Sequence, residues 1–306
     1  MSKIRFFLIY IFLYAILLTN SISASDYVEN ALRLYSERNY YAASLEFERA
    51  AYYGTDNTRI AHYKYLKSLC FKNLNDHKRA IEELNKINVF NLPDTLFYKI
   101  RYAQAYSYFL NNEPNKSLWN IEEIRIRFPD SLKITEIVPL NILCLNAIGK
   151  WSEAKYLWQF FLKNAGLEDS VKIVFLEEIE ALYSKRNIPK IYSAKTAETL
   201  SRFIPGAGQM YCGEFMEGSF NFIMNAAILA FAGYEFYMKY YITGYFVGLG
   251  LLNKTYNGGW HRAELLAEEK NFEEIRKFNL KTSTLLMRVL SEGKKDHGPW
   301  TMDHIL

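Results

Sequence analysis

A small residue recurs every 37 positions in the first half of this chain, and this repeat limits the available folds more than any other feature. A bulky residue follows each small residue four positions later, and residues spaced by four lie on one face of an α-helix. Each copy therefore predicts a helix that buries this face. The small residues are Ala43, Ala80, Ser117 and Ala154, and the bulky residues are Phe47, Leu84, Ile121 and Trp158.

A second helical stretch precedes each of these helices, as in "RIAHYKYLKSLCFKNL" and "LFYKIRYAQAYSYFLNN". One repeat is therefore a pair of helices, and its small residue lets the two helices approach to the roughly 8–10 Å of packed helices. A single pair cannot bury its apolar face, so stacked pairs share one core. We expect an all-α fold in which residues 25–188 form a helical-repeat solenoid of about four pairs, closed by a capping helix.

The repeat resembles the tetratricopeptide repeat family in the progression of aromatic and small residues on its second helix and in a closing proline at Pro129. The resemblance covers residues 24–165. The period of 37 departs from the family's roughly 34 residues, and the first-helix tryptophan and glycine are absent. A solenoid presents an extended concave surface that can bind a protein partner. The candidate inner-surface residues lie on the first helix of each pair and include Tyr63, Tyr102 and Tyr106, for which packing is the default role.

The first 24 residues have the three parts of a secretory signal peptide: Lys3 and Arg5, an apolar run over Phe6–Leu18, and small residues from Ser21. The apolar run is too short for the roughly 20 residues of a membrane-spanning helix. We therefore expect export through the secretory pathway, with the repeats in the periplasm. An uncleaved anchor helix is the alternative.

Export would favour disulfide formation between the cysteines at positions 70, 144 and 212. However, Cys70 and Cys144 occupy the same position in repeats that are two units apart. We expect their Cα atoms to lie much farther apart than the roughly 7 Å limit of a disulfide. We expect no disulfide within the chain.

The C-terminal domain, residues 189–290, contains a nearly uncharged stretch over about residues 218–252. The run Phe220–Met238 is long enough to cross a bilayer, whereas the run Tyr240–Leu252 is shorter. We expect a tight antiparallel hairpin that associates with a membrane, by crossing it fully, by crossing it incompletely or by lying at its interface.

Two sets of residues in this hairpin have an expected role in its packing or function. Gly244 and Gly248 have the small-xxx-small spacing that lets membrane helices approach closely. Asn221, Asn225 and Glu235 are costly in lipid, and they support the alternative of a helical hairpin buried in a soluble domain.

A glycine-rich element precedes the hairpin and comprises Pro205, Gly206, Gly208, Gln209, Tyr211 and Gly213. Such an element before a helix can bind phosphate, but no Gly-Lys-Ser/Thr sequence and no predicted strand accompany it. We expect a sharp turn where the chain enters the membrane. The element P-G-x-G-Q-x-Y-x-G, followed by Asn253, Tyr256 and Gly258, is similar to the C-terminus of uncharacterised exported bacterial repeat proteins. This resemblance implies architecture and location, not an activity.

An amphipathic helix follows the hairpin, and residues 291–306 form a polar tail that we expect to be frayed. The apolar positions of this helix are Ile275, Phe278, Thr282, Leu285 and Val289.

The sequence contains no recognisable catalytic constellation. Its five histidines are scattered without metal-ligand spacing, and no serine or cysteine has the context of a nucleophile. The formal net charge of +4 arises from mixed charges, with no basic block for nucleic acid. We therefore expect no catalytic residue, metal, cofactor, nucleic acid or small-molecule substrate.

These features predict a non-enzymatic scaffold or adaptor of the cell envelope, which binds a protein through its repeats and is tethered to a membrane by its hairpin. The alternative is that the hairpin itself assists insertion or transport across the envelope, through Asn221, Asn225 and Glu235. An enzyme built from distant residues is a third possibility.

Overall fold

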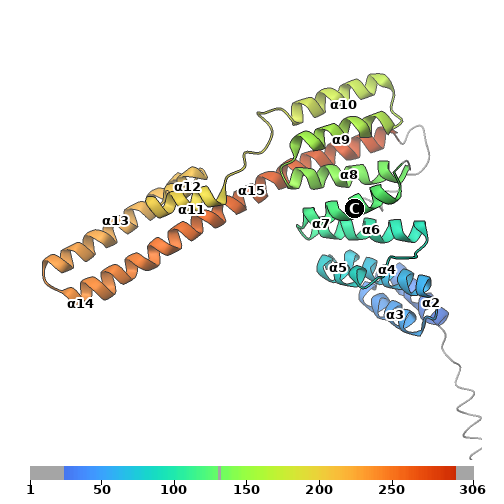
Figure 1. Cartoon of the computed structure of the whole chain (residues 1–306), viewed down its shortest axis with the longest axis horizontal. Coiled ribbons are helices and arrows are strands. Elements are labelled where there is room, and N and C mark those ends of the chain that lie inside the picture. The colour runs from blue at the N-terminus through green and yellow to red at the C-terminus, as the bar shows by residue number, and fades with distance from the viewer. Residues whose placement is uncertain (1–23, 130–131, 294–306) are drawn as a thin grey trace, which may run out of the picture. The chain divides into compact units, whose positions relative to one another are not determined.

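The computed structural model describes residues 24–129 and 132–293, and within these ranges every regular element is a helix (Figure 1). The expected all-α class is confirmed for this part of the chain. The expected signal peptide lies outside the described residues except for Ala24. Of the expected tail, residues 294–306 also lie outside them, whereas residues 291–293 complete the last helix.

The chain divides into two compact units, residues 1–144 and 145–306. The domain boundary expected at residue 188 lies inside the second unit. In the first unit, consecutive helices contact one another along the chain, and α4 also contacts α6. These helices are α2 (Ala24–Ser36), α3 (Tyr40–Tyr53), α4 (Asn57–Asn73), α5 (His77–Asn85), α6 (Asp94–Leu110) and α7 (Pro114–Arg127), followed by α8 (Leu132–Ala147), which continues into the second unit.

One turn geometry recurs at the 37-residue period and joins the two helices of each pair. A residue with positive φ ends the first helix, and the N–H of the next residue donates to the carbonyl oxygen five positions earlier, at 2.9 Å in all four copies. This pattern is a Schellman turn. The positive-φ residues are Arg38 (60°), Asn75 (57°), Asn112 (59°) and Gly149 (76°). The second helices begin two residues later, at Tyr40, His77, Pro114 and Trp151.

The residues expected to pack the repeats are buried. The small residues Ala43, Ala80, Ser117 and Ala154 have no exposed surface, and Phe47, Leu84, Ile121 and Trp158 are at most 1% exposed. The hydroxyl of Ser117 also accepts a hydrogen bond from the Cys144 thiol over 3.1 Å. A larger side chain at these positions would separate the helices, because the site has no free volume.

Partly buried ion pairs connect neighbouring helices of the first unit. The ammonium group of Lys67 on α4 lies 2.6 Å from Glu48 on α3 and 3.1 Å from Glu83 on α5. Glu83 also pairs with Lys86 at 2.8 Å. Burial alone would raise the pKa of Glu83, but hydrogen bonds from Lys86 and Lys67 hold it below the ordinary value.

The second unit contains the long helix α15 (Gly250–Gly293), whose C-terminal part packs against α9 and α10. The ring of Phe278 lies 5.0 Å from that of Trp151 and 5.3 Å from that of Tyr183. These contacts place α9 and α10 in one unit with the C-terminal helices. The remaining elements are α9 (Trp151–Asn164), α10 (Asp169–Leu182), α11 (Ala194–Phe203), α12 (Ala207–Tyr211), α13 (Phe215–Tyr237), α14 (Tyr241–Thr243) and the π-helix η1 (Gly244–Leu249).

The sequence suggests that the second apolar run and the amphipathic helix are separate segments, but in the structure they form one continuous helical stretch. From Tyr241 to Gly293 the chain is helical throughout, through α14, η1 and α15. Gly258 and Gly259 lie inside α15 and do not interrupt it. Each glycine in a helix costs about 1 kcal/mol relative to alanine, and the packing of Gly259 described below offsets this cost.

Candidate functional site

The glycine-rich element forms a tightly packed junction between α11, α12 and α13. Gly206 has a φ of 90° and precedes α12. A Cβ atom at Gly206 would overlap the carbonyl oxygen of Gly218 on α13, and one at Gly208 would overlap the carbonyl oxygen of Ala197 on α11. These glycines therefore do more than form the expected turn, because they let three backbones approach one another. Pro205 lies between the end of α11 and this contact and is half-buried.

Gln209 connects this junction to α15 through a chain of buried hydrogen bonds. The N–H of Gly208 donates to the hydroxyl of Ser201 over 2.9 Å, and this hydroxyl donates to the side-chain oxygen of Gln209 over 2.9 Å. The side-chain nitrogen of Gln209 donates to the carbonyl oxygen of Gly259 over 2.9 Å. Gln209 is 1% exposed, so its amide holds α11, α12 and α15 in one register.

Tyr211 and Gly213 complete the element at its outer end. The hydroxyl of Tyr211 accepts a hydrogen bond from the N–H of Ser193 over 3.3 Å, and its ring packs edge-on against Tyr192 at 5.5 Å. Gly213 ends α12 with a φ of 88°. Asn271 on α15 fixes the same end of α11, since its side chain bonds both the N–H and the carbonyl of Tyr192, over 2.7 and 2.8 Å.

The expected hairpin polar residues Asn221 and Asn225 face the opposite arm of the hairpin. The side-chain nitrogen of Asn225 donates to the side-chain oxygen of Asn221 over 2.6 Å, and Asn225 accepts a bond from the Thr255 hydroxyl over 2.9 Å. Asn221 and Asn225 are 7% and 3% exposed. Both ends of the Asn225 amide and the side-chain oxygen of Asn221 are therefore bonded within the hairpin, which reduces the cost of these groups in an apolar surrounding.

Gly244 and Gly248 also face α13. A Cβ atom at Gly248 would lie 2.6 Å from the Cβ of Ala232, and one at Gly244 would lie 3.3 Å from the ring of Phe236. The turn between the arms has the same form as the repeat turns: Lys239 has a φ of 67°, and the N–H of Tyr240 donates to the carbonyl oxygen of Glu235 over 2.9 Å. Figure 1 shows α13 and the first part of α15 lying side by side, in agreement with their contacts.

The outer surface of the hairpin is apolar. By length and composition, α13 is the one helix of the described residues that could span a membrane, with a mean hydropathy of 1.3 over its most apolar window. A core helix of a soluble protein can have the same composition, but only 22% of this window is buried. Half-buried Glu235 lies near the tip. The exposed apolar side chains include Phe220, Phe222, Ile223, Leu229, Phe231, Ile242, Phe246 and Leu251.

Charged pairs gather at the base of the hairpin. Arg262 on α15 lies 3.1 Å from Glu217 on α13 and 2.9 Å from Glu269, and Lys270 pairs with Glu214. From position 218 to position 253, by contrast, the only charged residues are Glu235 and Lys239. The base is therefore suited to water, whereas the arms over residues 218–253 are suited to an apolar medium, and exposed Lys254 lies between the two.

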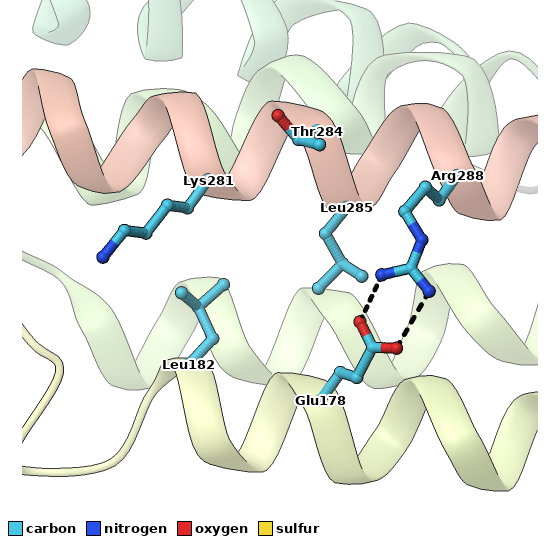
Figure 2. Close-up of a pocket in the computed structure, with 6 residues that line it drawn as sticks. All are labelled: Glu178, Leu182, Lys281, Thr284, Leu285 and Arg288. Atoms are coloured by element: carbon cyan, nitrogen blue, oxygen red, sulfur yellow. Dashed lines mark hydrogen bonds and ion pairs between the residues drawn. The ribbon is translucent and has the colours of Figure 1, made fainter.

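The described residues contain no cluster of groups that could hold a metal ion. The three cysteines are free and buried, and burial raises the pKa of the Cys70 and Cys144 thiols to about 12. A hollow of about 280 Å³ lies between α10 and α15 (Figure 2). Its Arg288 and Glu178 side chains neutralise each other through two contacts of 2.6 and 2.9 Å, so we assign it no ligand.

The residues expected from the sequence did not include Ser201 and Gly259, which bond Gln209. They also did not include Thr255, which bonds Asn225, or Asn271, which bonds the backbone of Tyr192. Gly258 is the last of the three residues, Asn253, Tyr256 and Gly258, that follow the glycine-rich element in the motif. It has open space around its Cα, whereas a Cβ atom at the neighbouring Gly259 would lie 2.5 Å from the Asn221 amide. Of the other two members, Asn253 bonds only its neighbour Asn257, and Tyr256 donates to the carbonyl oxygen of Arg202.

No family model, curated protein or solved structure matches this chain.

Proposed function

We propose that this protein is a non-enzymatic scaffold of the cell envelope, exported by its N-terminal segment, bound to a protein partner through its repeats and tethered to a membrane by the hairpin of α13, η1 and α15. The observation that carries the proposal is the distribution of polarity in the hairpin: Asn221 and Asn225 bond within it, while the surface around them is apolar. A hairpin of a soluble protein would need other helices to cover that surface.

The length of the hairpin agrees with a bilayer. The 23 residues of α13 extend about 34 Å at 1.5 Å per residue, and a hydrocarbon core is about 30 Å thick. Helix also continues from Tyr241 into α15, but this second arm is uncharged only as far as Asn253, a length of about 20 Å. The first arm therefore has the length for a full crossing, whereas the second arm reaches it only if the side chain of Lys254 extends toward the membrane surface.

The same geometry makes the tether the better of the two hypotheses for the hairpin. A hairpin that transports or inserts a substrate needs polar groups accessible to that substrate. Of the three residues expected in that role, Asn221 and Asn225 instead form hydrogen bonds with each other and with Thr255, and Glu235 lies half-buried near the tip.

The repeats support a protein-binding role. Solenoids of paired helices present extended surfaces to their partners, and the recurring turn and packing residues support such a stack. Half-buried tyrosines on the first helices can supply contact area at low entropic cost. They are Tyr63 and Tyr65 on α4 and Tyr98, Tyr102 and Tyr106 on α6, and the three on α6 also pack against the core of the first unit.

Alkaline extraction of membranes from cells that express the full chain tests the tether. We expect the protein to stay in the membrane pellet, and the double substitution Ile223→Lys and Leu229→Lys to release it. The matched control replaces two exposed aliphatic residues of α10, in the variant Ile173→Lys and Val174→Lys, and should stay in the pellet. A wild-type chain that is monodisperse in buffer without detergent would contradict the proposal.

A photo-reactive amino acid at Tyr102 tests the repeat surface, with exposed Tyr156 on α9 as the control position. We expect one specific crosslinked protein from position 102 in intact cells and none from position 156. Equal crosslinking from both positions would contradict a specific surface on the first helices.

A further inference from the structure

The C-terminal end of α11 presents apolar side chains to solvent beside the base of the hairpin. Phe203 is 83% and Ile204 55% exposed, and Leu200 is exposed one turn earlier. Adjacent apolar side chains of this size indicate an interaction surface when they continue a larger apolar region. Here they lie next to the hairpin, because Gly206, two residues after Ile204, contacts Gly218 on α13, where the uncharged stretch begins.

Contacts at the two ends of α11 show its direction relative to α15. Tyr192, just before α11, bonds Asn271, whereas Arg202, near its end, accepts a hydrogen bond from Tyr256. Helix α11 therefore runs antiparallel to α15. Its C-terminal end, with Phe203, points toward the tip of the hairpin.

The side chains at this level are those that favour a membrane surface. The guanidinium of Arg202 lies 4.1 Å from the centre of the Trp260 ring, and the hydroxyl of Tyr256 lies beside them. Tryptophan and tyrosine concentrate at the boundary between lipid and water, and long cationic side chains extend to it. On one side of this level lie the paired charges of the hairpin base, including Glu217 and Arg262. On the other side lie the arms, which are apolar except for Glu235, Lys239 and exposed Lys254, whose long side chain can extend back to the headgroup layer.

We propose that the end of α11 is a second membrane contact, in which Leu200, Phe203 and Ile204 insert into the leaflet through which the hairpin enters. The Arg202–Trp260 pair then lies in the headgroup layer and sets the depth of insertion. This inference rests on the proposed membrane tether. Arg202 already pairs with Glu198 at 2.7 Å, so the contact depends on apolar insertion and needs no anionic lipid.

Spin labels in the full chain, reconstituted in phosphatidylcholine vesicles, measure this depth. The three native cysteines are buried, so single cysteines introduced as Phe203→Cys, Phe231→Cys and Ile173→Cys can be labelled selectively. The readout is the ratio of accessibilities to oxygen, which concentrates in lipid, and to a water-soluble nickel chelate. We expect the highest ratio at position 231, an intermediate ratio at 203 and the aqueous ratio at 173, unchanged when phosphatidylglycerol is added.

The three labelled positions distinguish an error in this inference from an error in the proposed membrane tether. An aqueous ratio at both 203 and 231 would show that the hairpin does not insert, which overturns the proposed function as well. A high ratio at 231 with an aqueous ratio at 203 would overturn the second contact alone. A ratio at 203 as high as that at 231, or a depth at 203 that requires phosphatidylglycerol, would overturn the assigned level and mode of insertion.

Discussion

The side-chain nitrogen of Gln209 donates a hydrogen bond of 2.9 Å to the carbonyl oxygen of Gly259, which lies 50 positions later in the chain. A helical carbonyl that accepts a bond from another helix fixes the height at which the two helices meet. Ser201 bonds the other end of the same amide. The base of the hairpin is therefore held to α11 and α12 by directional bonds as well as by apolar contacts.

Replacing Gln209 with leucine should destabilise the second unit by about 1–3 kcal/mol, because buried polar groups of Ser201 and Gly259 lose their partner. Thermal unfolding of the full chain in detergent measures this effect. The matched control is Gln159→Leu at an exposed position of α9, where we expect almost no change. Similar unfolding temperatures for the two variants would show that the buried amide does not hold the junction.

Neighbouring glycines on α15 should respond in opposite ways to alanine. Gly258 has open space around it, so Gly258→Ala should stabilise the helix by about 0.5–1 kcal/mol. At Gly259 the new methyl group would meet the Asn221 amide, and we expect a loss of about 1–3 kcal/mol from overpacking. Denaturant unfolding in detergent measures both variants. Equal effects would mean that the arms do not meet at Gly259.

The repeat could be predicted from the sequence because its signal is local and periodic. Helical spacing between Ala43 and Phe47, kept over four copies, indicates which face is buried without knowledge of the partner helix. Asn75, Asn112 and Gly149 are also typical of left-handed turns, but Arg38 in the first copy is not, and the recurring turn was missed.

The junction could be predicted only in part, because its partners are far apart in the sequence. Glycines such as Gly206 and Gly208 are typical of a turn, and the sequence alone predicts nothing beyond that turn. Their close contacts with Gly218 and Ala197 depend on which helices lie opposite. In the same way, Asn221 and Asn225 look costly in lipid until Thr255 is known to bond with them.

Arg38 is an unfavourable residue for its backbone conformation, with a φ of 60° at the end of α2. The left-handed conformation costs non-glycine residues about 1–2 kcal/mol. Replacing Arg38 with glycine, the residue found in the fourth copy, should therefore stabilise the protein by about 1 kcal/mol. The reciprocal variant Gly149→Ala should destabilise it by a similar amount. Urea unfolding followed by circular dichroism checks the pair, and a loss of stability in Arg38→Gly would contradict the shared turn.

Glu83 should make the stability of the repeats depend on pH in the acidic range. Hydrogen bonds from Lys86 and Lys67 hold the pKa of Glu83 in the folded state below its ordinary value of 4.5, despite the opposing effect of burial. Its contribution is fully present above the unfolded pKa and is lost as the pH falls through the lower folded pKa. The stability difference between the wild type and Glu83→Gln, measured by urea unfolding, should therefore be largest near neutral pH and shrink below about pH 4.5. The exposed neighbour provides the control as Glu82→Gln, which should stay close to the wild type. A difference for Glu83→Gln that is constant from pH 7 to pH 3 would show that the two lysines do not act through the charge of this carboxylate.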